Sequence, residues 1–363
     1  MTEKTRKLAM YLDQNALDML IKKGTDAHLF ALKESFNIVY SDGTLREIYK
    51  AGHNASDINA SLKFTKALTN LGAVYFQLPD ISLNTDDRPY ECTDAPNDVF
   101  LRFLNEVVPF DKFTQPFEKM GLALYNGVKD YDCFGNDQIT AMYNLRNFLH
   151  ENLELLEAEL LECGNERIEN HLQTAIDEYR KQIYELDSQL DEFQENVKYG
   201  IDSFKEANQI NSIHKTFQKA YNINIDNLKK IEGDNALNRI FDYIDQVKPK
   251  NTPSLREAHQ IIFDDNERIF NKIPHIYSLL NLVGYYSDEN LNKEKRFLSS
   301  TLDSHHAQLG CFCDIFVTHD QKFAKKMKVI YEHFNIGTQI YDIDILENRI
   351  SLKPLYNLEL GIL

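Results

Sequence analysis

Four acidic residues lie at or beside the predicted ends of strands, two near each end of the sequence. They are Asp13, Glu47, Asp303 and Asp320. Asp13 directly follows the apolar run at residues 8–12, and Asp320 lies just beyond a buried-type strand at residues 314–318. Ligands of open parallel sheets bind at the carboxyl ends of the strands. The positions of these acids therefore predict a shared site at that edge of a sheet.

A cluster of carboxylates favours one kind of chemistry. Like charges disfavour joint ionisation, so the cluster is stable only if hard cations neutralise it. Oxygen ligands without cysteine or a clear histidine set indicate Mg²⁺ or Mn²⁺ rather than zinc. Two such ions about 4 Å apart can activate water and stabilise both reacting oxygens of a phosphodiester. We therefore expect a metal-dependent phosphodiesterase that needs no serine or histidine nucleophile.

The two ends of the chain predict the elements that would position these acids. Short apolar runs at residues 8–12, 37–40 and 73–78 alternate with helical patterns, including helices from residue 44 and over 57–69. The C-terminal part resumes this alternation, with strands at 314–318 and 339–343 and helices at 301–311 and 322–334. Such alternation is typical of βαβ units, so we expect an α/β fold with a mostly parallel sheet flanked by helices.

The middle of the chain has a different pattern. Residues 97–290 follow a helical period, and a heptad seam marks one helix. Its members are Ile176, Tyr179, Ile183, Leu186, Leu190, Phe193 and Val197. Apolar residues between Met142 and Leu160 predict a preceding helix that ends near Gly164. We expect a large all-α insertion at 91–294 with a coiled-coil-like antiparallel hairpin, between sheet-forming parts at 1–90 and 295–363.

Three segments of the sequence resemble the PIN-like ribonuclease family. They are YLDQN (11–15), SDGTLREI (41–48) and DSHHAQLGCFCDIFVTHDQKF (303–323), which stand in the order expected of the family. The resemblance covers roughly residues 6–85 and 295–345. Glu47 and Asp303 stand 256 positions apart, much farther than in a compact PIN domain.

The resemblance implies a role for each matching residue. Asp13, Glu47, Asp303 and Asp320 would be the catalytic, metal-binding carboxylates. Asn15, Asp314 and Thr318 would support them. The implied activity is cleavage of single-stranded or structured RNA with Mg²⁺ or Mn²⁺.

Each acid also has a purely structural interpretation. Thr44 and Glu47 fit a capping box at a helix start. Asp320 fits a helix N-cap, and Asp303 fits an acid favoured by the helix dipole. There are three sets of weaker candidates. His305 and His306 could contact metal or phosphate, and Arg146 and His150 resemble an Arg–His pair of ribonucleases. The possible phosphate contacts beside Asp320 are Lys322, Lys325, Lys326 and Lys328, which fit surface lysines of an amphipathic helix equally well.

Composition sets the remaining expectations. The chain of 363 residues has a formal net charge of −16, which argues against a constitutive basic coat for nucleic acid. Five cysteines without a CxxC pair indicate reduced thiols and a cytoplasmic location. No apolar run reaches the length of a membrane span.

We therefore predict a metal-dependent endonuclease that acts on nucleic acid, with RNA favoured over DNA. One alternative is a structure-selective DNA nuclease. Another is a non-catalytic protein that acts through its helical insertion, by forming a homo-oligomer or by binding a protein partner.

Overall fold

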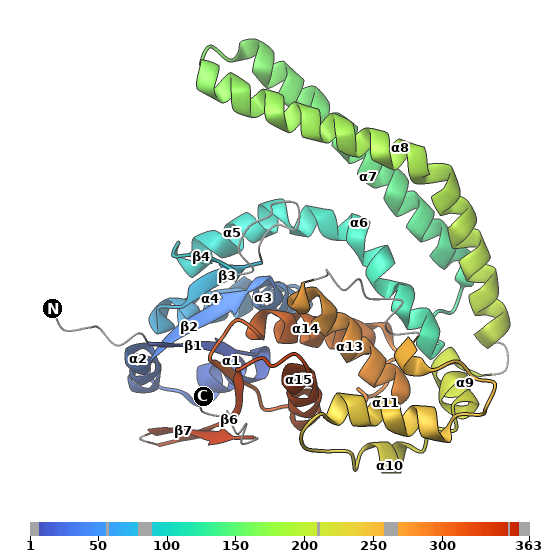
Figure 1. Cartoon of the computed structure of the whole chain (residues 1–363). Coiled ribbons are helices and arrows are strands. Elements are labelled where there is room, and N and C mark those ends of the chain that lie inside the picture. The colour runs from blue at the N-terminus through green and yellow to red at the C-terminus, as the bar shows by residue number, and fades with distance from the viewer. Residues whose placement is uncertain are drawn as a thin grey trace. The chain divides into compact units, whose positions relative to one another are not determined.

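The computed structural model describes residues 7–55, 58–78, 89–208, 211–257, 268–347 and 349–355. The chain forms two compact units (Figure 1). The first, here the sheet unit, comprises Met1–Val107, Thr216–Asn290 and Leu298–Leu363. The second, here the helical unit, comprises Val108–Lys215 and Leu291–Phe297.

The described part of the sheet unit contains a seven-stranded sheet with the order β4-β3-β2-β1-β5-β6-β7. Its strands are β1 (Leu8–Leu12), β2 (Phe36–Ser41), β3 (Val74–Gln77), β4 (Tyr90–Cys92), β5 (Ile315–Val317), β6 (Gln339–Leu346) and β7 (Arg349–Pro354). Strands β1, β2, β3, β5 and β6 pair in parallel, whereas β4 and β7 pair antiparallel at the two edges. The expectation of an α/β fold with a mostly parallel sheet is confirmed at this level.

The order of the strands creates a topological switch point beside β1. The chain places β2 and then β3 on one side of β1, and later places β5 and then β6 on the other side. Tyr11 of β1 pairs with Val39 of β2 and with Phe316 of β5. Ligands of open α/β sheets bind at such a point, outside the carboxyl ends of the strands. The end of β1, where Asp13 stands, is therefore the position at which a ligand is expected.

Helices connect the strands of the sheet unit. They are α1 (Gln14–Lys23), α2 (Asp26–Ser35), α3 (Asp42–Ala55), α4 (Ile58–Leu71), α5 (Pro96–Glu106), α14 (Glu294–Gly310) and α15 (Gln321–His333). Four of the five residues of β1 are buried in an unbroken run. A strand buried without alternation is covered on both faces, as in parallel sheets with helices on each side.

Part of the expected insertion belongs to the sheet unit. Its helices are α10 (Ile225–Leu228), α11 (Ala236–Val247) and α13 (Ile269–Val283), and α9 (Ile213–Ala220) leads into them. Buried apolar residues of α11 and α13, such as Ile240 and Leu280, share one core with Phe316 of β5 and Met327 of α15. The insertion expected at 91–294 is therefore longer than the helical unit, because α10, α11 and α13 bury apolar residues in the core of the sheet unit.

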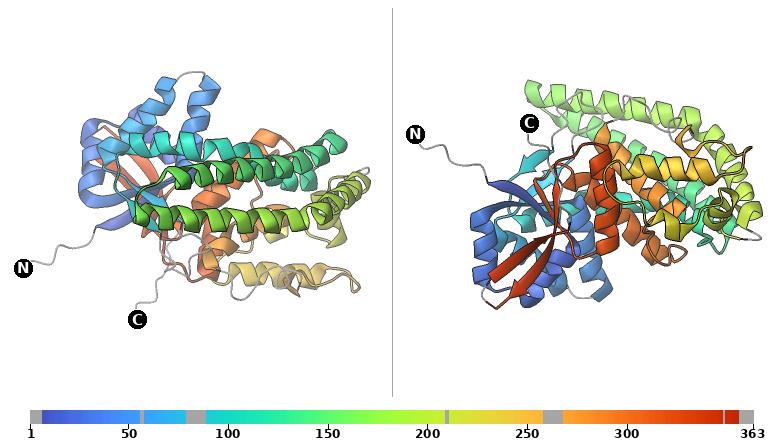
Figure 2. Two further views of the ribbon diagram at one scale, coloured as in Figure 1. Left: turned by 90° about the horizontal axis from the view of Figure 1, so that it is seen from above. Right: turned by 60° about the horizontal axis from the view of Figure 1, so that its bottom comes forward.

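The helical unit is built on two long helices. It contains α6 (Val108–Glu118), the short 3₁₀ helix η1 (Lys119–Tyr125), α7 (Tyr131–Glu162) and α8 (Glu166–Asn208). Helices α7 and α8 lie side by side in Figures 1 and 2. Ion pairs join Arg146 to Asp187 and Glu157 to Arg180, as an antiparallel hairpin requires.

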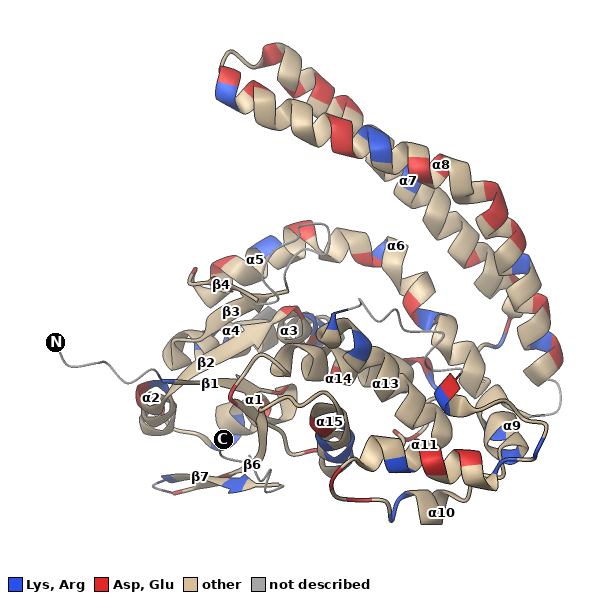
Figure 3. Cartoon of the chain, in the orientation of Figure 1, with Lys and Arg blue, Asp and Glu red and all other residues tan. Residues whose placement is uncertain are grey.

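The hairpin buries one row of the heptad seam and half-buries the other. Ile176, Ile183, Leu190 and Val197 are buried, whereas Tyr179, Leu186 and Phe193 are half-buried. Figure 3 shows that acidic residues dominate the surface of the hairpin. Helices α7 and α8 together hold 18 acidic and six basic residues, a formal net charge of −12 out of −16 for the chain. Most of the net negative charge of the protein therefore lies on this hairpin.

No helix in the described ranges is both long enough and apolar enough to cross a membrane.

Candidate functional site

Asp13 stands at the switch point of the sheet, fixed by its backbone and its side chain. Its N–H donates to the carbonyl oxygen of Val317 at 3.1 Å, which joins the ends of β1 and β5. Its Oδ1 accepts from the N–H of Ala16 at 2.7 Å and thereby caps α1. The hydroxyl of Thr318 also donates to the Asp13 carboxylate. Asp13 is only 4% exposed, so the fold holds a buried carboxylate at this point.

Thr318 links Asp13 to Asp320. Thr318 follows β5, is fully buried, and accepts from the N–H of Asp320 on its Oγ1 at 3.0 Å. Asp320 itself is exposed and is the N-cap of α15, with Oδ1 accepting from the N–H groups of Lys322 and Phe323 at 2.8 and 3.0 Å. The structural interpretation of Asp320 as a helix cap therefore applies, and both capping bonds use the same oxygen.

Glu47 contacts His306 and does not form the capping box with Thr44. Helix α3 begins at Asp42, so Thr44 lies inside the helix, where its Oγ1 accepts from the N–H of Ser41 at 3.4 Å. The Oε2 atom of Glu47 lies 3.0 Å from Nε2 of His306. His306 is 1% exposed, and its Nδ1 lies 2.6 Å from the hydroxyl of Tyr11. His306 thus connects Glu47 to Tyr11 of β1, the strand that directly precedes Asp13.

Asp303 lies one turn before His306 on α14 and is half-buried. Burial raises its pKa well above the ordinary value, and the negative charges of Asp288 and Glu47 raise the pKa further, whereas His306 and Lys326 oppose them. No described residue forms a hydrogen bond with the Asp303 carboxylate. An ionised Asp303 is therefore costly in the folded protein, and a bound cation would reduce that cost.

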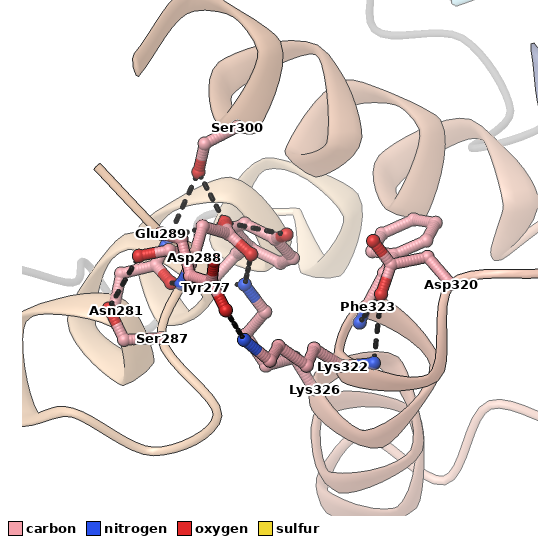
Figure 4. A network of polar contacts seen from close by, with 10 residues as sticks. All are labelled: Tyr277, Asn281, Ser287, Asp288, Glu289, Ser300, Asp320, Lys322, Phe323 and Lys326. Carbon is pink, nitrogen blue, oxygen red and sulfur yellow. Dashed lines mark hydrogen bonds and ion pairs between the residues drawn. The ribbon is translucent and has the colours of Figure 1, made fainter. Parts of the chain in front are cut away.

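Asp288 and Lys326, whose charges act on Asp303, form a buried ion pair that Figure 4 shows. The Lys326 ammonium is completely buried and lies 2.6 Å from Oδ1 of Asp288 and 3.0 Å from Oδ1 of Asn281. It also lies 3.9 Å from the centre of the Tyr277 ring. The other carboxylate oxygen of Asp288 accepts from the hydroxyls of Tyr277 and Ser300 and from the amide of Asn281. Burial lowers the pKa of Lys326, and the charges of Asp288, Asp303 and Asp320 oppose this shift.

From the sequence, Lys326 was a candidate only for a surface contact with phosphate, and Asp288 was not a candidate at all. One feature of the sequence could have shown that Lys326 is buried. It lies among Phe323, Met327 and Ile330, which form the buried stripe of α15 at helical spacing. A lysine on such a stripe needs a buried anionic partner. The sequence does not identify that partner, because Asp288 lies in the segment that the pattern assigned to the insertion.

The fold brings the four predicted acids into one electrostatic neighbourhood. The charges of Glu47 and His306 both act on the pKa of Asp13 and on that of Asp303. Asp303 and Asp320 both act on the pKa of Lys326. These residues come from the ends of β1 and β5 and from α3 and α14.

The proposed supporting residues are not all at this edge. Thr318 contacts two of the acids, as described above, and Asn15 is exposed on α1. Asp314 lies at the opposite end of β5 from Thr318, and its Oδ2 accepts from the N–H of Ala9 at 2.7 Å. The structure therefore does not bring Asp314 to the acids, because the length of β5 lies between Asp314 and Thr318. Arg146 pairs with Asp187 within the helical unit.

The fit of the acids to a metal ion is partial. Within the described ranges, no group of three or more His, Cys, Asp or Glu side chains is placed to hold a metal ion. The donor type nevertheless suits a hard cation, because the acids offer carboxylate oxygens. The Asp303 carboxylate also lacks a hydrogen-bond donor among the described residues, and its pKa is raised. The carboxylates are thus ligands of the type that Mg²⁺ or Mn²⁺ prefers. Two of them already have partners, since Glu47 contacts His306 and Asp320 caps α15.

The buried carboxyl of Asp13 predicts a measurable pH dependence of stability. Burial raises the pKa of Asp13 from 3.8 to about 6, although the hydrogen bonds from Thr318 and Ala16 oppose the shift. A raised pKa in the folded state means that the folded protein binds the proton more tightly than the unfolded chain does. The protonated Asp13 carboxyl therefore stabilises the folded protein fully below about pH 4, and this stabilisation is lost as the pH rises through about 6. The loss is at most about 3 kcal/mol.

Asp13→Asn tests this dependence, because asparagine caps a helix as well as aspartate does. In EDTA, we expect the free energy of unfolding of the wild type to fall relative to that of Asp13→Asn between pH 4 and 6. Above pH 6 the difference should stay constant. Urea denaturation at four pH values measures it, and parallel curves for the two proteins over this range would contradict the assignment.

No protein-family model, curated protein or solved structure matches this chain. The resemblance to PIN-like nucleases therefore depends on the three sequence segments alone.

Proposed function

We propose that this protein is a divalent-metal-dependent nuclease that hydrolyses phosphodiester bonds of RNA, with a PIN-like sheet unit. One observation carries the proposal. Asp13, Glu47 and Asp303 come from three distant segments of the chain, Asp13 stands at the switch point of a parallel sheet, and the charges of Glu47 and His306 act on both Asp13 and Asp303. Open α/β sheets bind ligands at this point. Buried groups with strongly perturbed pKa values are also typical of functional sites.

Asp13, Glu47, Asp303 and Asp320 would hold Mg²⁺ or Mn²⁺. When bound, such an ion supplies an acidified water and stabilises charge on the phosphodiester oxygens. The chain contributes position and charge. Thr318 and the N–H of Ala16 orient the Asp13 carboxylate, and Thr318 also binds the backbone of Asp320. The fixed charge of Lys326 reduces the negative potential that a phosphodiester meets near Asp303.

The distribution of charge removes one objection to a nucleic-acid substrate. Helices α7 and α8 carry a net charge of −12, so the rest of the chain carries only −4 of the total of −16. The preference for RNA over DNA rests on the family resemblance alone. A structure-selective DNA nuclease is therefore the alternative within the same chemistry.

A specific observation favours a second role for the helical unit. Large apolar or aromatic side chains are exposed on α7 and α8, among them Leu155 at 64%, Leu161 at 88%, Tyr184 at 75% and Tyr199 at 78%. Exposed side chains of this kind are enriched at sites of protein interaction. A second copy of the chain would bring a hairpin of the same negative charge, so a different protein is the favoured partner over a homo-oligomer.

A cleavage assay with end-labelled single-stranded RNA and DNA of one sequence tests the proposed function. We expect RNA to be cut in Mn²⁺ or Mg²⁺ and to stay intact in EDTA. Either ion should also raise the melting temperature, because it binds the folded state preferentially. At a hundredfold excess over its Kd, the ion stabilises the folded state by about 2.7 kcal/mol. The shift should weaken at low pH, where protons compete for the carboxylates.

The assay needs a matched control for the removal of a carboxylate. Asp98→Asn removes an exposed acid on α5 and should leave both cleavage and the metal-dependent shift unchanged. Cleavage that persists in EDTA, together with a melting temperature that does not respond to Mn²⁺ or Mg²⁺, would contradict the proposed function. DNA cut faster than RNA would support the alternative substrate.

A further inference from the structure

A chain of buried polar contacts leads from the end of β2 to Glu47. The hydroxyl of Ser41 lies 2.6 Å from that of Tyr11, and the Tyr11 hydroxyl lies 2.6 Å from Nδ1 of His306. On the other side of the ring, Nε2 of His306 lies 3.0 Å from Oε2 of Glu47. Both ring nitrogens of His306 are thus engaged, and Glu47 is the last group of the chain.

The surrounding residues hold the His306 ring in one orientation. The Tyr11 ring stacks on Phe316 with ring centres 5.2 Å apart, so the anchor of the imidazole is itself packed in the core. A Cβ atom added at Gly43 would lie 3.0 Å from Cε1 of His306, which is tighter than ordinary contact. A side chain at position 43 would therefore require the His306 ring to shift by a few tenths of an ångström.

Glu47 has a flexible side chain that could sample several orientations without a partner. Its contact with His306 uses Oε2, and Oε1 takes no part in this chain of contacts. Outer-shell groups that bind a ligating carboxylate fix its orientation, and their loss typically lowers metal affinity by about 10- to 100-fold. His306 also lies three residues after Asp303 on α14, so one helix carries an acid of the proposed site and the residue that orients another.

We propose that His306, anchored by Tyr11 and Ser41, is a positioning residue that fixes the Glu47 carboxylate for a divalent cation. This inference rests on the proposed function, because it assumes that Glu47 binds the ion. It adds a residue that the PIN-like segments do not assign to the site. His306 does not itself contact the substrate in this proposal. It acts by restricting the orientations of Glu47.

The test measures Mn²⁺ affinity by isothermal titration calorimetry in the full-length protein, so that the readout does not depend on activity. We expect His306→Phe to weaken Mn²⁺ binding by about 10- to 100-fold. His306→Gln keeps an amide donor for Glu47 and should recover much of that loss. Tyr11→Phe removes the anchor but leaves the imidazole, and it should give an intermediate affinity.

A matched control separates positioning from a general effect of losing a buried histidine. His28 is 5% exposed on α2 and binds Thr25, so His28→Gln should leave the Mn²⁺ affinity unchanged. If His306→Phe does not fold, the comparison of His306→Gln and Tyr11→Phe with the wild type decides the question. Melting temperatures without metal identify variants that are merely destabilised.

The outcomes distinguish this inference from the proposed function. A wild type that binds no Mn²⁺ overturns the proposed function and this inference with it. A wild type that binds Mn²⁺, with equal affinity in folded His306→Phe, His306→Gln and Tyr11→Phe, overturns the positioning role of His306 alone. Weaker binding in His306→Phe with recovery in His306→Gln supports it.

Discussion

Lys326→Met is expected to lower the free energy of unfolding by about 3–5 kcal/mol, because it leaves the Asp288 carboxylate buried without its cation. Lys326 is completely buried, and Asp288 keeps only neutral partners in the variant, namely Tyr277, Asn281 and Ser300. Hydrogen bonds from neutral groups do not offset the cost of a buried charge. Denaturation in urea with EDTA measures the change.

Two further variants make the result specific to the buried pair. Lys322→Met removes an exposed lysine from the same helix, whose partner Glu289 is also exposed, so its effect should stay within about 0.5 kcal/mol. The double variant Lys326→Met/Asp288→Asn removes both charges and should be more stable than Lys326→Met alone. Equal stability of the wild type and Lys326→Met would mean that the buried pair does not exist in solution.

Asp303→Asn is expected to reduce RNA cleavage by at least about 100-fold and to raise the stability of the metal-free protein. A neutral amide binds a hard cation poorly, and charge stabilisation by such an ion contributes several kcal/mol, at about 1.4 kcal/mol for each factor of ten in rate. Burial and the charge of Asp288 raise the pKa of Asp303, so the ionised carboxylate costs stability that asparagine does not.

The sign of this stability effect follows from the direction of the pKa shift. Because the folded-state pKa is above the ordinary value, the wild type loses stability as the pH rises above the ordinary pKa of aspartate. Asp303→Asn lacks this loss, so its advantage in melting temperature should be larger at pH 8 than at pH 4. Saturating Mn²⁺ should remove the advantage, since only the wild type binds the ion well.

Cleavage and melting temperature should therefore change in opposite directions in Asp303→Asn. Asp98→Asn, the exposed control on α5, should change neither. A folded Asp303→Asn protein that cuts RNA as fast as the wild type would show that Asp303 is not a ligand of the proposed metal.

The sequence predicted the central strands because their signal is local. Strand β1 is an unbroken apolar run, and the predicted strands at 37–40, 73–78, 314–318 and 339–343 all coincide with observed strands. The edge strands β4 and β7 were not predicted. No residue of either strand is buried, so both lack the apolar run that marks a buried strand.

The order of the acids along the chain was also visible in the sequence, together with their positions relative to the strands. Asp13 follows β1, and Asp320 follows Thr318 just past β5. Adjacent parallel strands end at the same edge, so strand ends alone predicted that these two residues meet. Asp314 was assigned to the site only by the resemblance to PIN-like nucleases, and in the structure it lies at the opposite end of β5 from Thr318.

The sequence by itself determined the parallel sheet, the acids at its carboxyl edge and the amphipathic helices, since each follows from a period or from a residue next to a strand. Only the tertiary structure decided which partners those residues have. Lys326 pairs with Asp288 across 38 residues, and Glu47 contacts His306 across 259. Contacts over such distances leave no periodic trace in one sequence. They form because helices α13, α14 and α15 bury their apolar faces in the core of the sheet unit, and burial forces each charged group to find a partner there.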